Sequence, residues 1–267
     1  MNSICPLPPY NLLALYKDPA VNHISGFRNI TEQIELDELI AAYHRMREIA
    51  PKRHERKKAY FVDHTGFTSS GAYSNRREEH LAIALWNSSK DDGHLQLPNG
   101  QPLSLLDYQF PLKAQQGDKG VGKVDLFGVV DGIQPSVIEL KIDPATSGRS
   151  DTPLRAFLEA LAYCAIIEAN FDDIAFEASE KMGVDIANNR IALILIAPEL
   201  YWSKYIHYPR AGDWLPALQN LADQVSSSLK LDTHFLSLHD STFKMGLDGE
   251  SPRLVNGCSL KSVANLI

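Results

Sequence analysis

Two spacings of apolar positions recur along the chain and predict its secondary structure. In four segments apolar residues return every three to four positions, which places them on one side of an α-helix. In five others, short apolar runs rich in β-branched and aromatic residues lie between turn-forming residues, which is typical of strands. Helices are therefore predicted over residues 31–50, from 74 to before 93, 154–169 and 213–229, and strands over residues 103–112, 123–130, 136–142, 190–197 and 233–238.

Residues that begin helices support these boundaries. Thr31 and Ser74 can cap a helix N-terminus with a side-chain oxygen, and Pro153 has the fixed φ that favours a first turn. From residue 74 to 197 the order is helix, three strands, helix, strand, which predicts an α/β domain. We expect residues 1–70 to form a helical appendage with a basic linker. The main domain is then 71–267, with a core at 74–197 and a C-terminal extension at 198–267.

Composition and charge narrow the class of protein. The 267 residues are 44% hydrophobic and 22% charged, which is ordinary for one large globular domain or two small ones. With 26 Lys and Arg against 33 Asp and Glu, the net charge of −7 provides no overall positive field for nucleic acid. Cys5, Cys164 and Cys258 lack metal-ligand spacing, and no signal peptide or run of 18 apolar residues is present. We expect a cytoplasmic protein without a membrane partner.

Two segments combine positive charges in ways that allow two interpretations each. Residues 52–58 carry five positive charges against one negative and form either a solvated linker or a phosphate-contacting patch. Residues 201–210 alternate aromatic rings with Lys204, His207 and Arg210. They form either a base-stacking surface or an aromatic edge strand packed on the following helix, and the second is favoured.

The phosphate-binding loop of an ATPase is present only in part. Residues 117–123, Gly-Asp-Lys-Gly-Val-Gly-Lys, match it, but Val124 replaces the hydroxyl residue that binds magnesium. A strand pattern also follows where that loop needs a helix. The serine-hydrolase elbow and the His pairs of zinc hydrolases are missing from the sequence. None of these classes is supported.

Charged residues on two adjacent strands form the most informative pattern. Residues 123–142 hold two apolar strands joined by an Asp-Gly turn, which predicts a β-hairpin. A turn centred on Gly132 or Ile133 places Asp125 opposite Glu139 or Lys141, and these three charged side chains then share one face. Such charges on apolar strands are costly unless they pair or bind something. The other, buried face would receive the interleaved residues Val124, Ile138, Leu140 and Ile142.

An Asp on one strand followed by Glu-x-Lys on the next resembles the PD-(D/E)xK nuclease superfamily. Asp125, Glu139 and Lys141 match this motif, with Val124 in the place of its proline, and residues 74–197 match the element order of the family. Members often carry a Glu on the first helix, which either Glu78 or Glu79 matches. The resemblance implies a restriction-endonuclease-like core, with a mixed central sheet flanked by helices.

The resemblance also implies the chemistry of a nuclease that uses Mg²⁺ or Mn²⁺ to cut nucleic acid, DNA in the first place. Lys141 would hold the attacking water or neutralise charge on the phosphate. Glu159 stands where some members have a Gln four residues before a Tyr, here Tyr163. A homodimer or an accessory protein is left open. The implied metal ligands are Asp125, Glu139, the carbonyl of Leu140 and one of Glu78 and Glu79. The candidate nucleic-acid contacts are Arg155 and Lys123 near the motif, and Arg53 and Lys57 in the basic run at 52–58.

Other functions remain alternatives. The same fold can bind nucleic acid or a partner without cutting it, although a site that has lost activity usually loses its costly charges. A nucleotide-binding ATPase would rest on the incomplete loop at 117–123. Each charge also has a structural explanation: Glu139 and Lys141 as an exposed strand-face ion pair, Asp125 as a polar residue at the start of a strand, and Glu78 as a partner of the helix dipole.

Overall fold

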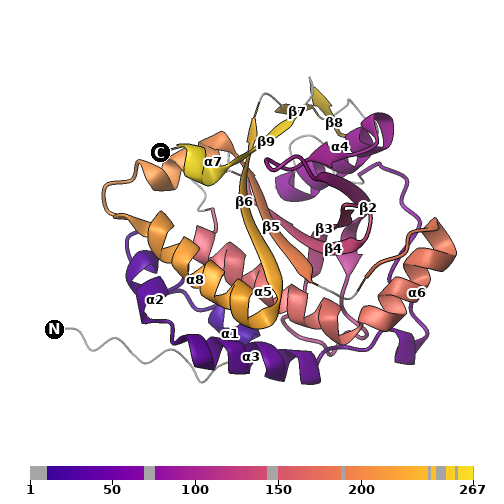
Figure 1. Ribbon diagram of the computed structural model, residues 1–267, viewed down its shortest axis with the longest axis horizontal. Coiled ribbons are helices and arrows are strands. Elements are labelled where there is room, and N and C mark those ends of the chain that lie inside the picture. Colours follow the sequence, from indigo (N-terminus) through magenta and orange to yellow (C-terminus); the bar gives the residue numbers. More distant parts are fainter. Residues whose placement is uncertain are drawn as a thin grey trace.

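The computed structural model describes residues 11–68, 76–142, 150–187, 190–239, 242–244, 251–255 and 258–266 (Figure 1). Ser74, the expected helix cap, and Cys5 lie outside these ranges. The helices are α1 (Leu12–Leu15), α2 (Phe27–Gln33), α3 (Leu36–Glu48), α4 (Arg77–Asp92), α5 (Pro153–Ala169), α6 (Phe171–Met182), α7 (Glu199–Ile206) and α8 (Trp214–Leu229), with 3-10 turns η1 (His54–Arg56) and η2 (Val263–Leu266). The strands are β1 (Leu95–Gln96), β2 (Pro102–Pro111), β3 (Lys123–Val130), β4 (Gln134–Leu140), β5 (Ile191–Pro198), β6 (Leu231–His239), β7 (Thr242–Lys244), β8 (Arg253–Val255) and β9 (Ser259–Ser262).

Seven strands form one mixed sheet in the order β1-β2-β3-β4-β5-β6-β9. Neighbours from β1 to β4 are antiparallel, β4, β5 and β6 are parallel, and β9 is antiparallel to β6. The two edge strands, β1 and β9, contact each other, so the sheet curls until it is nearly a barrel. The expected α/β fold with a mixed central sheet flanked by helices is confirmed.

Helices cover both faces of this sheet (Figure 1). On one face α5 packs against β4 and β5 while α8 packs against β6, and on the other face α4 packs against β2, β3 and β4. The N-terminal helices α1, α2 and α3 pack against α5 and α8. Leu12, Phe27, Tyr43 and Tyr60 belong to the same apolar cluster as α5. The segment that we expected to be an appendage therefore shares its core with the face that α5 covers.

Several predicted elements have the predicted bounds. β3 covers Lys123–Val130, and Pro153 is the first residue of α5. Thr152 caps that helix, because its hydroxyl accepts a hydrogen bond of 3.3 Å from the backbone N–H of Arg155. Residues 117–122 lead directly into β3 rather than into a helix, as expected from the strand pattern after the incomplete phosphate-binding motif.

The helix predicted over residues 31–50 begins differently. Thr31 lies inside α2, where its hydroxyl donates a hydrogen bond of 2.8 Å to the carbonyl of Phe27, four residues earlier. This back-bonding competes with the regular helix ladder, and α2 ends two residues later, at Gln33. A separate helix, α3, then starts at Leu36 with Glu35 as its N-cap. The prediction of Thr31 as a cap was wrong.

The first part of the aromatic segment at 201–210 is helical rather than an edge strand, because α7 extends to Ile206 and residues 207–210 follow it as turns. Tyr201, Trp202 and Tyr205 lie on the buried side of α7, since residues three and four apart share a helix face. Trp202 stacks on Trp214 of α8, with ring centroids 6.4 Å apart. The expected packing on the following helix is therefore present although the element type was wrong. Burial also removes these three rings from any base-stacking surface.

Among the helices that the structure describes, none is long and apolar enough to cross a membrane.

Candidate functional site

The hairpin of β3 and β4 places Asp125 opposite Glu139. Phe127 pairs with Val137, and Leu126 pairs with Ile138, so the next step of the antiparallel register joins 125 to 139. Of the two registers that the sequence allowed, the turn centred on Gly132 is therefore the one present. Ile138 and Leu140 lie in the apolar cluster beneath α4, and Ile142 packs against it, as expected for the opposite face of β4.

Val124 does not follow this alternation. It lies in the cluster on the α5 face with its β2 partner Phe110, whereas Leu126 and its partner Tyr108 lie in the cluster beneath α4. Residues two apart therefore occupy opposite faces on both strands. The change of face occurs at Gln109, whose φ of 51° is left-handed. The irregular backbone at this point breaks the period of two on which the prediction for Val124 rested.

Lys141 brings the carboxylates of the site together. Its Nζ lies 2.6 Å from Oε1 of Glu139, and 3.8 Å from both Oδ2 of Asp151 and Oε2 of Glu159. Lys141 and Glu139 are each only 4% exposed. Oε2 of Glu139 is buried without a hydrogen-bond partner among the described residues.

The carboxylate of Asp125 is held at both oxygens. The backbone N–H of Leu140 donates to Oδ2 at 2.9 Å, and Nε2 of Gln109 donates to Oδ1 at 3.1 Å. The Asp125 carboxylate thus accepts the hydrogen bond of a backbone N–H at the end of β4, that of the residue after Glu139.

Burial and mutual repulsion disturb the protonation of these groups. Burial raises the pKa of Asp125 to about 7 despite the opposing effect of Lys141, and Glu78 raises it further. Burial likewise raises the pKa of Glu139 well above its usual range, again against Lys141. Burial would lower the pKa of Lys141, but the surrounding carboxylates, Glu139 foremost, raise it well above its usual range. Lys141 is therefore a permanent cation in this cluster.

Glu78 and Glu79 occupy different environments, although both lie in the first turn of α4. Burial raises the pKa of Glu78, which also interacts with Lys141 and accepts a hydrogen bond from the backbone of Ile142. Glu79 instead pairs with Arg76, whose Nη1 lies 3.5 Å from its Oε2. The structure therefore brings Glu78 to the cluster around Lys141 and directs Glu79 toward Arg76.

The four expected nucleic-acid contacts are also in different environments. Lys123 and Lys57 are exposed. Arg155 is half-buried and pairs with Asp151 over 2.8 Å. Arg53 is buried, and its guanidinium donates to the carbonyls of Ala59 and Lys113. The guanidinium of Arg53 therefore links two segments of this chain through their backbone carbonyls.

Several side chains of the basic run at 52–58 form hydrogen bonds to backbone carbonyls elsewhere in the chain. Lys52 donates to the carbonyl of Ala169 at the end of α5, and Lys58 donates to the carbonyl of Ala114 over 2.6 Å. These bonds use the positive charges to satisfy backbone oxygens of neighbouring segments. Lys52, Arg53 and Lys58 are therefore engaged with this chain, whereas Lys57 is exposed without such a bond among the described contacts.

Two residues of the cluster escaped the sequence analysis. Asp151 has a recognisable signal, since it precedes the Thr152 cap and lies four residues before Arg155, a spacing that favours an ion pair. Gln109 has no such sequence signal, because amide side chains are common in amphipathic strands. Its contact with Asp125 depends on a backbone conformation that the sequence does not reveal.

The donor set suits a hard divalent cation. Carboxylate and carbonyl oxygens are the ligands that Mg²⁺ prefers, and Oε2 of Glu139 is a buried oxygen without a partner in the described part of the chain. Across the described ranges, no group of three or more His, Cys, Asp or Glu side chains is gathered closely enough to hold a metal by itself. The residues therefore fit such an ion only when substrate oxygens, water or a backbone carbonyl complete its ligands.

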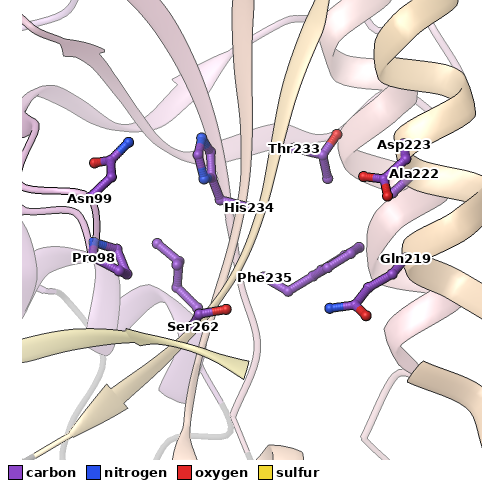
Figure 2. A pocket seen from close by; sticks show the side chains of 10 residues that line it. Pro98, Asn99, Gln219, Ala222, Asp223, Thr233, His234, Phe235 and Ser262 are labelled. Carbon is purple, nitrogen blue, oxygen red and sulfur yellow. The ribbon is translucent and has the colours of Figure 1, made fainter. Parts of the chain in front are cut away.

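A cavity of about 420 Å³ lies apart from this cluster, beside β6 (Figure 2). None of the predicted site residues, all of which the structure describes, lines it. Burial lowers the pKa of His234 at its wall, against the opposing effect of Asp232, so its imidazole is neutral at pH 7. The lining has no Lys or Arg, which does not suit a phosphate. It consists of Pro98, Asn99, Gln219, Ala222, Asp223, Thr233, His234, Phe235, Leu236 and Ser262.

Comparison with protein-family models, with curated proteins and with solved structures finds no significant match to this chain. Any assignment of function therefore depends on the site residues and their geometry.

Proposed function

We propose that the protein is a metal-dependent nuclease of the PD-(D/E)xK type that hydrolyses phosphodiester bonds of DNA. The observation that carries this proposal is the buried cluster at the end of the hairpin. There Asp125 and Glu139 lie side by side, Lys141 bonds Glu139 over 2.6 Å, and Oε2 of Glu139 has no hydrogen-bond partner among the residues that the structure describes. The order α4, β2, β3, β4, α5, β5 supports the same assignment, with the short strand β1 and the helix α6 as insertions, and the proposal includes a restriction-endonuclease-like core.

Asp125, Glu139 and the backbone carbonyl of Leu140 would hold the metal, Mg²⁺ or Mn²⁺. When bound, the ion supplies an activated water and neutralises charge on the phosphate. Glu78, held by the backbone of Ile142, is the helix carboxylate that joins this set, directly or through water. Glu79 is left out, because it pairs with Arg76.

Lys141 acts as a cation and hydrogen-bond donor. The carboxylates around it keep its pKa well above the usual range, so at neutral pH it cannot take a proton from water. Its ammonium can donate to the attacking water or to a phosphate oxygen, where negative charge increases in the transition state. Because it is almost fully buried, this interaction is stronger than the same contact would be in water.

Two cations beside the cluster, the exposed Lys123 and the half-buried Arg155, would hold the substrate backbone. Lys123 begins β3 two residues before Asp125, a separation of about 6.6 Å along a strand. Arg155 lies in the first turn of α5 and is neutralised by Asp151 in the free protein. No carboxylate among the described residues pairs with Lys123, so its ammonium can contact a phosphate. Arg155 can exchange Asp151 for a phosphate oxygen.

The test is cleavage of circular DNA, linear DNA and RNA by the purified protein, with EDTA, Mg²⁺ or Mn²⁺. We expect metal-dependent cutting of DNA by the parent and none by Glu139→Ala. Arg190→Ala removes an exposed ion pair with Asp232 just before β5, at the end of that strand away from Leu195, the partner of Glu139; it is the matched control and should cut like the parent. DNA binding without cutting at any metal concentration would instead favour the binding-only alternative.

A further inference from the structure

One residue at the site has a backbone conformation that its place in the fold does not explain. Of the described residues other than Gly, four have a positive φ. Lys57 and Lys230 end helical segments, and Asp131 lies in the turn of the β3–β4 hairpin, where left-handed residues are usual. Gln109, with φ of 51°, lies inside β2 instead. Such a conformation costs a non-Gly residue free energy and usually persists where the surrounding structure requires it.

The side chain of Gln109 shows what this conformation achieves. Its Nε2 donates to Oδ1 of Asp125 at 3.1 Å, while the backbone of Leu140 donates to Oδ2 at 2.9 Å. Donors at both oxygens fix the rotation of a carboxylate that would otherwise turn freely about its last bond. The change of face at Gln109 also separates Phe110 and Val124 from Tyr108 and Leu126.

We propose that Gln109 is a positioning residue that orients the Asp125 carboxylate for a divalent cation, and that its left-handed backbone is retained for this purpose. The inference rests on the proposed function, because it assigns a role toward the metal of that same site. Groups that hydrogen-bond a metal ligand typically change metal affinity 10- to 100-fold when they are removed. A merely structural amide would affect the stability of the metal-free protein and leave its metal affinity unchanged.

Two variants separate the amide from the backbone conformation. Gln109→Met keeps the length of the side chain and the left-handed backbone but removes the donor. Gln109→Gly removes the donor and also relieves the backbone, since Gly adopts positive φ without steric cost. Lys230→Gly is the matched control, because it relieves the same conformation at an exposed helix end.

The measurements are calorimetric titration of each metal-free protein with Mn²⁺, and thermal unfolding in EDTA. We expect Gln109→Met and Gln109→Gly to bind Mn²⁺ 10- to 100-fold more weakly than the parent. In EDTA, Gln109→Gly should melt no lower than the parent, as should Lys230→Gly, which should also bind Mn²⁺ like the parent. Weaker binding by a variant that remains equally stable would support the proposal.

Two results would overturn it and can be told apart. If the parent and both Gln109 variants bind Mn²⁺ equally, the inference fails while the proposed function stands. If the parent binds no Mn²⁺ at millimolar concentration, the proposed function fails and the inference fails with it. Should Gln109→Met fold poorly, Gln109→Gly alone decides between these results.

Discussion

Two clusters of ionisable side chains in the described part of the chain, one beneath α4 and one at the end of the β3–β4 hairpin, differ in the balance of charge. Beneath α4, Nε2 of His64 lies 2.5 Å from Oδ1 of Asp107, and His64 stacks on Tyr108 with ring centroids 3.9 Å apart. One carboxylate there faces one imidazole. At the end of the hairpin, by contrast, two cations, Lys141 and Arg155, face five carboxylates: Glu78, Asp125, Glu139, Asp151 and Glu159.

We propose that this difference reflects a function of the hairpin cluster beyond stability. In the pair beneath α4, one imidazole lies against one carboxylate, and removing either partner would leave the other buried. Burial raises the pKa of Asp107 as well, but at the hairpin repulsion among several carboxylates adds to burial in raising the pKa values of Asp125 and Glu139. Strongly shifted pKa values of this kind cluster at functional sites.

The largest expected effect is a loss of cleavage activity when the hairpin cluster is changed, but not when the His64–Asp107 pair is changed. Asp125→Ala, Glu139→Ala and Lys141→Ala should each reduce metal-dependent cleavage at least about 1,000-fold, because each removes a group that acts on the reacting phosphate. Asp107→Ala should cut normally per folded molecule. Single-turnover cleavage at fixed metal and folded-protein concentration measures this. Full activity in any two of the three variants would remove this cluster from the reaction.

The second effect is a loss of folding stability at the His64–Asp107 pair. Asp107→Ala should lower the free energy of unfolding by about 3 kcal/mol, since it leaves His64 without its partner in a largely buried position. Urea unfolding monitored by circular dichroism in EDTA measures it. Ser227→Ala, at an exposed position on α8, controls for substitution as such and should change it by less than about 0.5 kcal/mol. An equally stable Asp107→Ala protein would show that the pair is not structural.

A smaller effect distinguishes the two glutamates of α4. Glu78→Gln should reduce cleavage about 10- to 100-fold, because Glu78 interacts with Lys141 at the site. Glu79→Gln should remain within about twofold of the parent, because its carboxylate pairs with Arg76 near the surface. Parallel cleavage assays with the two variants measure the ratio. Full activity in both would exclude α4 from the site.

The sequence predicted what depends on local pattern and missed what depends on backbone irregularity or distant contacts. The apolar alternation of residues 123–140 gave β3 its bounds and paired Asp125 with Glu139. It could not reveal the left-handed Gln109, so Val124 was assigned to the wrong face. Thr31 illustrates the same limit, since its hydroxyl suits both a cap and a back-bond inside a helix. Periodicity also left Glu78 and Glu79 equivalent, and only the position of α4 relative to Lys141 separates them.

The smallest expected effect follows from the pH dependence of the metal-free cluster. Burial raises the pKa of Asp125 to about 7 in the folded protein, whereas an unfolded Asp titrates near 3.9. Between these values the folded state holds a proton that the unfolded state has released, so stability falls as pH rises. The slope is at most about 1.4 kcal/mol per pH unit for one proton. Above pH 7 this loss is complete.

Asp125→Asn replaces the titrating carboxyl group, so the variant should lack this contribution to the pH dependence of stability. We expect the variant in EDTA at pH 7.5 to be as stable as the parent or up to about 1 kcal/mol more stable, because it relieves repulsion among buried carboxylates. At pH 5 the parent should regain the difference, since its Asp125 is then protonated and uncharged. Thermal unfolding of both proteins from pH 5 to 8 measures the two slopes. A variant that is less stable than the parent by the same amount at every pH would show that Asp125, like Asp107, belongs to a balanced structural pair.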